Sequence, residues 1–348
     1  MQKKLIALAI ASAFAAPAFA DTTVYGVVDA TVASMSGSGN KSDVSVWTDG
    51  LAGSRLGVKA SEDIGNGMKA GAVLEYKAPL VDGTGVTAAR QTLVSIEGGF
   101  GKVAAGYLQT TGYDFSRFDP TNGSMITPLG NITGKYNFMI GNSASLKRIA
   151  RAVSYASPDM GGFNIVVNYS GSYDGKTDVA VADSAASTKT PVYMVSANYA
   201  NGPLAAAVVY ANKTVSATSV KTTETAIGAS YDLGVATLSA TYQTNKVDTN
   251  ADSDTAMSVS AAAPFGASKV ILTYAKGTMT AQGADKDASG YTLAWLNSLS
   301  KTTTLYAAFS GMTQGSASTT YSVANNSLTA LSAGASSNMV ALGLNKKF

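Results

Sequence analysis

The chain contains no cysteine and no histidine among its 348 residues. Without cysteine it can form neither disulfides nor thiolate nucleophiles. Without histidine it lacks the commonest general base, the Ser-His-Asp triad and the usual zinc ligands. Only a carboxylate-based reaction stays open, and no pair of carboxylates stands out for it. The sequence therefore predicts a protein that is not an enzyme and that needs no metal and no cofactor.

The chain also lacks long apolar runs and a large excess of charge of either sign. Charged residues make up 14% of the chain, and eight prolines leave long stretches free to form strands. Beyond the first residues, no apolar run reaches the roughly 18 residues of a transmembrane helix. If such a chain enters a membrane, it must do so as a closed barrel, because open sheet edges leave backbone groups unpaired in lipid.

Residues 1–20 have the order of a secretory signal peptide. Two lysines precede an apolar stretch, and Ala18-Phe19-Ala20 supplies small residues at the cleavage site. An N-terminal membrane anchor is the alternative, but the apolar stretch is shorter than the roughly 20 residues that a spanning helix needs. Cleavage would leave Asp21 first and 23 basic against 22 acidic side chains. This near-neutral balance predicts no nucleic-acid partner.

The remaining residues, 21–348, are predicted to form one domain of strands with an apolar and a polar face. Apolar and polar residues alternate over several stretches, as expected for strands with one face against an apolar environment. The clearest stretches are Phe163–Ser170, Tyr193–Tyr199, Ala236–Gln243 and Tyr291–Trp295. A soluble sandwich would show the same alternation, so the links between the strands must decide.

About sixteen candidate strands are joined by links that are alternately short and long. The short links lie near Glu62–Asn66, Gly98–Gly101, Pro158–Gly162, Asn201–Pro203, Asp232–Gly234, Pro264–Ala267 and Asn297–Ser300. The long links lie near Ser34–Gly50, Pro79–Thr87, Thr111–Lys147, Gly171–Thr190, Lys213–Val220, Val247–Asp254, Thr278–Ala288 and Met312–Ser337. All long links then share one rim, which is typical of a transmembrane antiparallel β-barrel with short periplasmic turns and long external loops.

Aromatic residues support a membrane barrel. Many tyrosines, with Phe100, Phe163, Phe265 and Trp295, fall near strand ends, where amphipathic rings form the girdles of such barrels. The last strand alternates apolar residues from Val340 and stops at Phe348. A terminal phenylalanine matches the assembly signal that this class of barrel presents to its insertion machinery.

Several segments resemble a known family in order and spacing. They are Val24–Asp29, Ser54–Ala70, Leu74-Glu75, Arg90-Gln91, Gly98–Val103, Arg148, Ser154–Pro158, Gly162-Phe163 and Leu299–Tyr306. Together they resemble the trimeric general-diffusion porins of β-proteobacteria over nearly the whole mature chain. The chain departs from that pattern at Tyr107, at Arg151-Ala152 and in its last six residues. The resemblance implies a sixteen-stranded barrel, a third external loop (residues 111–147) folded into the lumen, and a homotrimer.

Every arginine of the chain lies between positions 55 and 151, and most are predicted to line the pore. Within the strands, charged residues share one face, and a guanidinium facing lipid near the midplane would cost roughly 2–4 kcal/mol. We therefore expect a basic wall facing the lumen and a loop with opposing charges, which together would sort ions and orient dipolar solutes. The alternative is that these arginines only pair with acids to hold the loop. The predicted constriction residues are Arg55, Lys59, Lys77, Arg90 and Arg148 on the wall, and Asp114, Arg117 and Asp119 on the loop.

The resulting prediction is an outer-membrane channel for passive diffusion of ions and small hydrophilic solutes, with a weak preference for anions. An adhesin or structural barrel with a plugged lumen is the alternative. The expected partners are two further copies of the chain, outer-membrane lipid and lipopolysaccharide, and the barrel-assembly machinery. Asp248, Asn250, Asp252 and Asp254 are spaced like the start of a calcium loop but lack its glycine and glutamate, so we expect a solvated loop or loose cation bridging to lipopolysaccharide.

Overall fold

The computed structural model describes residues 21–38, 40–81, 83–121, 125–173, 189–216, 218–326, 328 and 331–348, so the predicted signal peptide lies outside the described residues. The strands are β1 Asp21–Gly37, β2 Asn40–Thr48, β3 Arg55–Gly65, β4 Met68–Lys77, β5 Ala89–Gly98, β6 Gly101–Gln109, β7 Arg148–Ala156, β8 Phe163–Ser170, β9 Val192–Asn201, β10 Leu204–Val215, β11 Val220–Asp232, β12 Thr237–Val247, β13 Asp254–Phe265, β14 Ser268–Thr278, β15 Ala288–Ser300, β16 Thr303–Gln314 and β17 Ser336–Lys347. The short helices are α2 Thr111–Asp114, η1 Phe115–Phe118, α3 Pro128–Thr133, η2 Thr280–Gln282 and α4 Val323–Asn326. In the described part of the chain, no helix is long and apolar enough to cross a bilayer.

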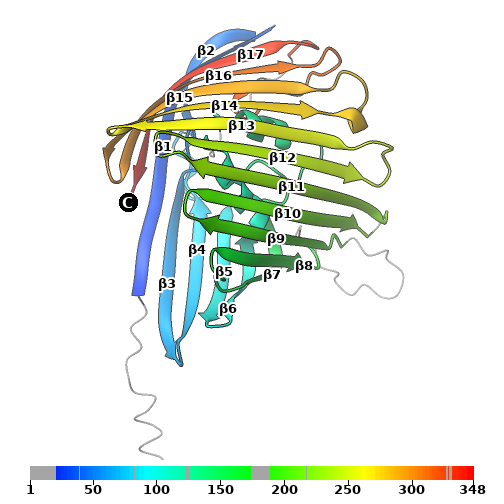
Figure 1. Cartoon of the computed structure of the whole chain (residues 1–348). Helices are drawn as coiled ribbons and strands as arrows, with labels where there is room; N and C mark the ends of the chain where they lie inside the picture. The colour runs from blue at the N-terminus through cyan, green and yellow to red at the C-terminus, as the bar shows by residue number, and fades with distance from the viewer. Residues whose placement is uncertain are drawn as a thin grey trace, which may run out of the picture.

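The strands form one closed antiparallel barrel (Figure 1). β1 closes the sheet against β17, in register from Val27 with Lys347 to Gly37 with Ser337. On its other edge, β1 pairs with β3 near its start and with β2 near its end, so β2 and β3 share one position in the wall. The predicted count of about sixteen is thus confirmed as a sixteen-strand barrel. Closure pairs the sheet edges, as the bilayer requires.

Short and long links separate onto two rims of the barrel. Residues 99–100, 202–203 and 266–267 are among the tight turns of one rim, which we call the short-turn rim. The opposite, long-loop rim carries the links 78–88, 110–147, 279–287 and 315–335. The prediction of a loop over Ser34–Gly50 is wrong, because β1 and β2 form a hairpin there. Glycine and serine around the hairpin turn obscured its strand pattern.

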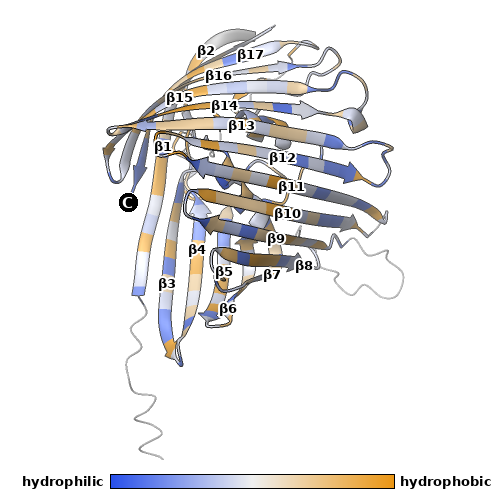
Figure 2. Cartoon of the chain, viewed as in Figure 1, coloured by the Kyte–Doolittle hydropathy of each residue, from blue (hydrophilic) through white to orange (hydrophobic). Residues whose placement is uncertain are grey.

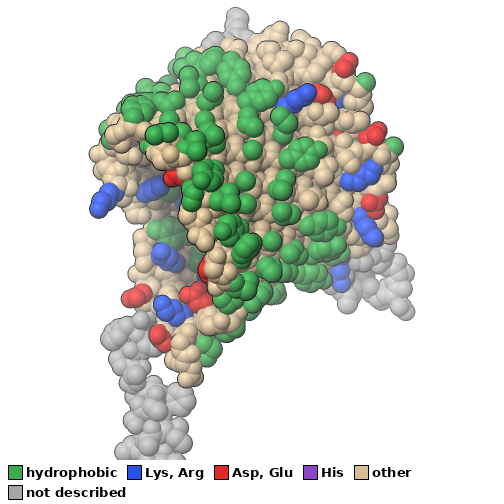
Figure 3. Space-filling model, viewed as in Figure 1, with side chains coloured by type: hydrophobic (Ala, Val, Ile, Leu, Met, Phe, Trp, Pro, Cys, Tyr) green, Lys and Arg blue, Asp and Glu red, His purple; other side chains and the backbone are tan. Residues whose placement is uncertain are grey.

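The two faces of the wall differ as the alternation predicts (Figure 2). Leu238, Tyr242, Tyr291 and Leu293 are exposed on the outer surface. On the space-filling view, hydrophobic side chains gather across the middle of the wall, with few charged side chains among them (Figure 3). The outer face therefore suits the apolar interior of a bilayer.

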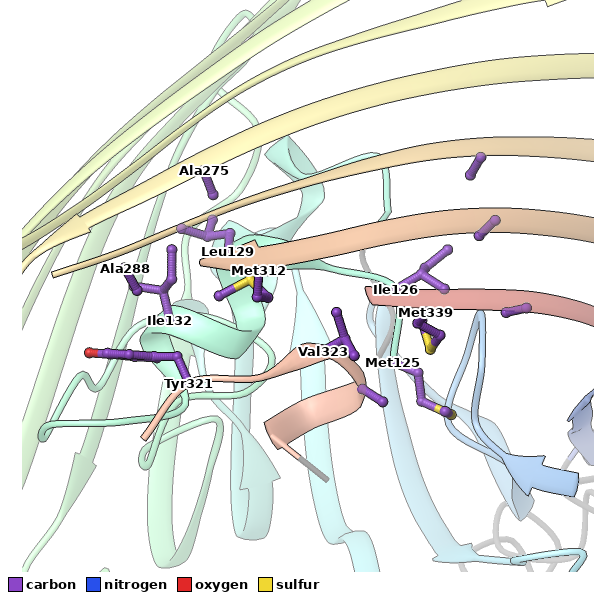
Figure 4. Packing of buried hydrophobic residues seen from close by; sticks show 14 of the residues in the cluster. Met125, Ile126, Leu129, Ile132, Ala275, Ala288, Met312, Tyr321, Val323 and Met339 are labelled. Carbon is purple, nitrogen blue, oxygen red and sulfur yellow. The ribbon is translucent and has the colours of Figure 1, made fainter. Parts of the chain in front are cut away.

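The hydrophobic core lies inside the barrel, between the long loop 110–147 and the inner face of the wall. In one cluster, Ile126, Leu129 and Ile132 of this loop pack against inward alanines such as Ala275 and Ala288 (Figure 4). Tyr321 and Val323 of the last loop join the same cluster. A second cluster contains Phe115, Phe118, Met139 and Ile140 of the loop, packed against β7, β9 and β10. The third loop is therefore folded into the lumen as predicted, and small wall residues make room for it.

Candidate functional site

Basic side chains line the inner face of β3 and β4. Arg55 pairs in register with Lys77, and Lys59 lies four residues further along β3, on the same face. Leu56 and Val58 point to the outer surface, where they are 37% and 38% exposed. Parity within the strand thus puts these three cations on the lumenal side. We call these three residues, together with Arg90, Lys147 and Arg148, the basic wall.

A carboxylate is set within the basic wall by a glycine. Tyr25, Gly57 and Glu75 lie side by side on three neighbouring strands. A Cβ on Gly57 would lie 2.4 Å from the Tyr25 ring, so only glycine lets the ring cross that strand. The Tyr25 hydroxyl then donates to Glu75 Oε2 at 3.1 Å. This contact fixes one oxygen of Glu75 and leaves the other for a cation.

Arg90 takes that second oxygen. Its Nε donates to Glu75 Oε1 at 2.8 Å, and the two side chains are 7% and 6% exposed. The register between β4 and β5 shifts where Glu75 and Tyr76 face Gln91 and Ala89. This bulge leaves Arg90 unpaired in the ladder and free to turn inward. A Cβ on Gly53 would lie 2.9 Å from Arg90 Nη1, so the guanidinium also packs against the link between β2 and β3.

That link, residues 49–54, folds inward around the buried carboxylate of Asp29. The carboxylate accepts the backbone N–H groups of Gly50 at 2.8 Å, Leu51 at 3.3 Å and Ala52 at 3.3 Å. The Tyr306 hydroxyl and Asn345 Nδ2 also donate to it, each at 2.7 Å. We call residues 49–54 the inward turn. No sequence signal revealed it, although Asp29 lies within a segment that carries the family resemblance.

Two further cations stand where the loop returns to the wall. Arg148 is 8% exposed, and its guanidinium carbon lies 4.9 Å from the centre of the Tyr113 ring. Among the described residues, no group accepts a hydrogen bond from its Nε or Nη2. Lys147 next to it is a residue that the sequence reasoning missed. Burial, with smaller contributions from Arg148, Lys77 and Arg90, lowers the pKa of Lys147 to about 8.

The loop residues predicted to oppose this wall are divided by the structure. Asp114 is exposed to the lumen, accepts Gln109 Nε2 at 2.6 Å, and interacts electrostatically with Arg117 and Arg148. Arg117 is also exposed; its Nη2 donates to Asn198 Oδ1 at 3.0 Å on β9, and its guanidinium carbon lies 4.6 Å from the centre of the Phe118 ring. Both residues are therefore available to solutes.

Asp119 does not line the lumen, contrary to the sequence-based expectation. It is 4% exposed and accepts the N–H and the hydroxyl of Thr121 at 2.9 and 2.5 Å. The Thr127 hydroxyl donates to its other oxygen. Burial raises the pKa of this carboxyl group, and the threonine contacts oppose the effect. Asp119 therefore stabilises the loop's own fold.

The lumen near the loop is thus dominated by positive charge. The basic wall comprises Arg55, Lys59, Lys77, Arg90, Lys147 and Arg148, while Glu75 and Asp114 are the carboxylates among them. An excess of positive charge along a passage is an arrangement that in general favours anions over cations. Glu75 neutralises part of the charge of Arg90, whereas the described residues offer no acceptor to Nε and Nη2 of Arg148.

Comparison with known proteins gives consistent matches. The family model described as Gram-negative porin matches residues 7–317. Outer membrane porin protein 32 of Delftia acidovorans is 34% identical over 220 residues, covering 61% of this chain and 60% of that protein. Major outer membrane protein P.IB of Neisseria meningitidis is 31% identical over 208 residues, covering 58% of this chain and 56% of that protein. The match thus spans less than two thirds of these relatives.

Solved structures match over nearly the full chain. The anion-selective porin from Comamonas acidovorans superposes with a TM-score of 0.79 at 29% identity, covering 94% of this chain and 100% of that one. The trimer form of OmpT from Vibrio cholerae superposes with a TM-score of 0.66 at 16% identity, covering 94% of this chain and 99% of that one. The second likeness concerns the fold alone.

Proposed function

Since this chain belongs to the Gram-negative porin family, we propose that it forms a water-filled channel through the outer membrane for passive diffusion of ions and small hydrophilic solutes. The observation that carries this proposal is the closed barrel whose charged strand residues, such as Arg55 and Lys77, face inward while its outer face is apolar. Charged side chains cost little free energy on that inner face only if water contacts it. Porins are channels, and we assign no catalytic activity to this one.

We further propose that the constriction lies between the basic wall and Asp114 and Arg117 of the inward loop, and that it favours anions. Cations outnumber carboxylates there, and one structural neighbour is described as anion-selective. Because the mature chain is nearly neutral, the preference must come from this local cluster, and we expect it to be weak. The role of the arginines as mere loop supports is the competing explanation.

The assembled unit is proposed to be a homotrimer in outer-membrane lipid. In the described part of the chain, the exposed aromatic side chains within strands all lie on β7–β16: Tyr155, Phe163, Tyr169, Tyr193, Tyr210, Tyr231, Tyr242, Phe265, Tyr274, Tyr291 and Phe309. The exposed large hydrophobics within β1–β6 and β17 are aliphatic: Val24, Val32, Val44, Val46, Leu56, Val58, Ile64, Leu74, Val94, Ile96, Val103, Val340, Leu342 and Leu344. Lipid-facing walls carry aromatic girdles.

We call the aliphatic wall of β1–β6 and β17 the smooth wall. A wall without a girdle suits burial against other copies around a threefold axis. Leu80, Val81 and Val86 in the loop that joins β4 to β5 are exposed on the same side and offer further apolar contact. The wall of β7–β16, which we call the aromatic wall, would then face lipid and, at the long-loop rim, lipopolysaccharide.

Phe348 is proposed as the signal that the barrel-assembly machinery reads. Its backbone exchanges hydrogen bonds with Gly26, at 3.0 and 3.2 Å, at the seam between the two ends of the sheet. The side chain is 58% exposed. An exposed terminal ring beside the closing seam is suitably placed for recognition before closure.

The test of the proposed function is the conductance of purified protein in planar bilayers, with the reversal potential measured in a salt gradient. Discrete current steps and a potential of the anion-selective sign are expected. A folded barrel without any conductance would instead favour a plugged structural protein or adhesin, and a cation-selective potential would exclude the proposed role of the basic wall.

A further inference from the structure

The tip of the inward loop, residues 110–147, contacts the barrel wall far from where the loop begins. Residues 137–141, which we call the loop tip, meet the inner face of β11 and β12. Three polar side chains lie beneath it: Glu224, with Gln243 and Asn245 on the neighbouring strand. Each is 1% exposed. Buried polar groups on an inner wall need partners, and the loop supplies them to the carboxylate of Glu224 and to the amide nitrogens of the other two.

The three side chains bind the backbone of the loop tip. Glu224 Oε2 accepts the N–H groups of Met139 and of Ile140, the latter at 3.3 Å. Gln243 Nε2 donates to the Ile140 carbonyl at 2.9 Å and to Glu224 Oε1 at 3.0 Å. Asn245 Nδ2 donates to the Asn137 carbonyl at 3.2 Å. The carboxylate is thus the centre of a network that holds the backbone in one position.

The backbone of the loop tip is shaped for this contact. Asn137 and the preceding Tyr136 have positive φ angles of 63° and 51°, which residues other than glycine seldom adopt. Such a conformation persists only where the surroundings hold it. The side chains of Met139 and Ile140 are fully buried, so their N–H groups have no access to water if the carboxylate is lost. A buried N–H group that loses its acceptor destabilises the position it occupies.

The loop tip is in turn tied to the acidic side of the passage. The Gly141 N–H donates to the Gly112 carbonyl at 2.9 Å, and the Gly112 N–H donates to the Met194 sulfur at 3.0 Å. Gly112 belongs to α2, which also contains Asp114 and the Tyr113 ring beneath Arg148. A displacement at Glu224 would therefore move Asp114 relative to the basic wall.

We propose that Glu224 is a positioning residue of the constriction: it fixes the loop tip on β11 and, through the contact between Gly141 and Gly112, contributes to the separation between Asp114 and Arg148. Glu224 itself is buried beneath the loop and touches no solute. The inference rests on the proposed channel, because it explains how the passage keeps a constant width. The start of the loop is held separately, by hydrogen bonds from Thr111 and Gly112 to side chains of β8 and β9. The Glu224 network holds its tip.

The test uses the absence of native cysteine. A Met139→Cys thiol should be protected from a charged methanethiosulfonate reagent, since Met139 is fully buried. Adding Glu224→Ala should make labelling faster, on the order of tenfold, because two buried N–H groups lose their acceptor. Glu224→Gln keeps one acceptor oxygen and should lie between them. The control is Glu97→Gln, which removes an exposed carboxylate paired with Lys102 at the short-turn rim.

Folding is checked by the heat-modifiable mobility of each variant, so an unfolded Glu224→Ala protein is replaced by Glu224→Gln. In bilayers, a folded Glu224 variant should show higher open-channel noise and altered selectivity. Equal labelling rates with and without Glu224, or unchanged noise and selectivity, would overturn the proposal. Labelling does not depend on conduction, so a failure of the channel proposal would be recognised separately.

Discussion

Arg90 and Glu75 form a buried ion pair on the inner wall, with Nε and Oε1 2.8 Å apart. The inward turn covers the guanidinium from one side, and Tyr25 holds the carboxylate from the other. Part of the charge of Arg90 is therefore neutralised at the wall. Glu75 thus sets how much of the positive field of the basic wall reaches a passing solute.

Replacing Glu75 with glutamine should strengthen anion preference. The substitution keeps the shape of the side chain and removes the negative charge next to Arg90. The ratio of anion to cation permeability, taken from the reversal potential in a salt gradient, should rise. Glu62→Gln is the control, because Glu62 has the parity of the outer face near the short-turn rim. An equal rise in both variants would contradict the assignment of Glu75 to the lumen.

Loss of Arg55 and Arg90 should shift selectivity toward cations. The Arg55→Ala, Arg90→Ala double variant removes two lumenal charges and also leaves Glu75 without its cation. Lys102→Ala is the control, because Lys102 is an exposed cation paired with Glu97 at the short-turn rim. Unchanged permeability ratios in the double variant would mean that these side chains do not face the narrowest section.

Anion preference should decline between about pH 7 and pH 9. The pKa of Lys147 is lowered to about 8, so the side chain is charged below that pH and becomes neutral above it. Loss of this charge weakens the basic wall as pH rises. Lys147→Met should show the reduced preference already at pH 7 and lose this pH dependence. Lys301→Gln in a short turn should keep it. A wild-type reversal potential that does not vary over this range would refute the assignment.

A bulky side chain on the smooth wall should break the trimer. Ala72 on β4 has the same outward parity as Leu74, while Ala240 on β12 is exposed between Leu238 and Tyr242 on the aromatic wall. Ala72→Trp should lower the trimer fraction on native gels and in crosslinking, because an interface tolerates added volume poorly. Ala240→Trp should leave it unchanged, since lipid adapts. The reverse result would place the interface on the aromatic wall.

The sequence predicts features that repeat within a strand. Alternation identified the outer face through Tyr242 and Leu293, and parity placed Arg55 and Lys59 together on the opposite face, as the structure has them. These predictions succeed because the strand period is independent of tertiary contacts. Long links such as Thr111–Lys147 and Thr278–Ala288 were also predicted correctly, whereas the predicted link over Ser34–Gly50 is a hairpin.

Contacts that join distant segments could not be predicted. The bulge that turns Arg90 toward Glu75 interrupts the parity of β5, and the Thr127 hydroxyl that helps to bury Asp119 belongs to the same loop but is eight residues away. Glu224 is separated by 85 residues from the Met139 N–H that it accepts. Nothing in the local pattern marks such a carboxylate as an anchor, because the alternation shows only that it faces inward.

Gly50 should be essential to the inward turn. A Cβ there would lie 1.9 Å from Thr31 Oγ1 and 2.2 Å from the Tyr306 hydroxyl, both of which belong to the network around Asp29. Gly50→Ala should therefore push the turn out of the wall, free Arg90 from its contact with Gly53, and cost roughly 1–3 kcal/mol as buried N–H groups lose their acceptor.

The expected result of Gly50→Ala is a lower temperature of heat-modifiable unfolding, together with a higher single-channel conductance as the turn leaves its place beside Arg90. Gly99→Ala is the matched control, since a Cβ on Gly99 in a short turn would have no described atom within 4 Å. A change in unfolding temperature without a change in conductance would mean that the inward turn supports the wall but does not border the passage.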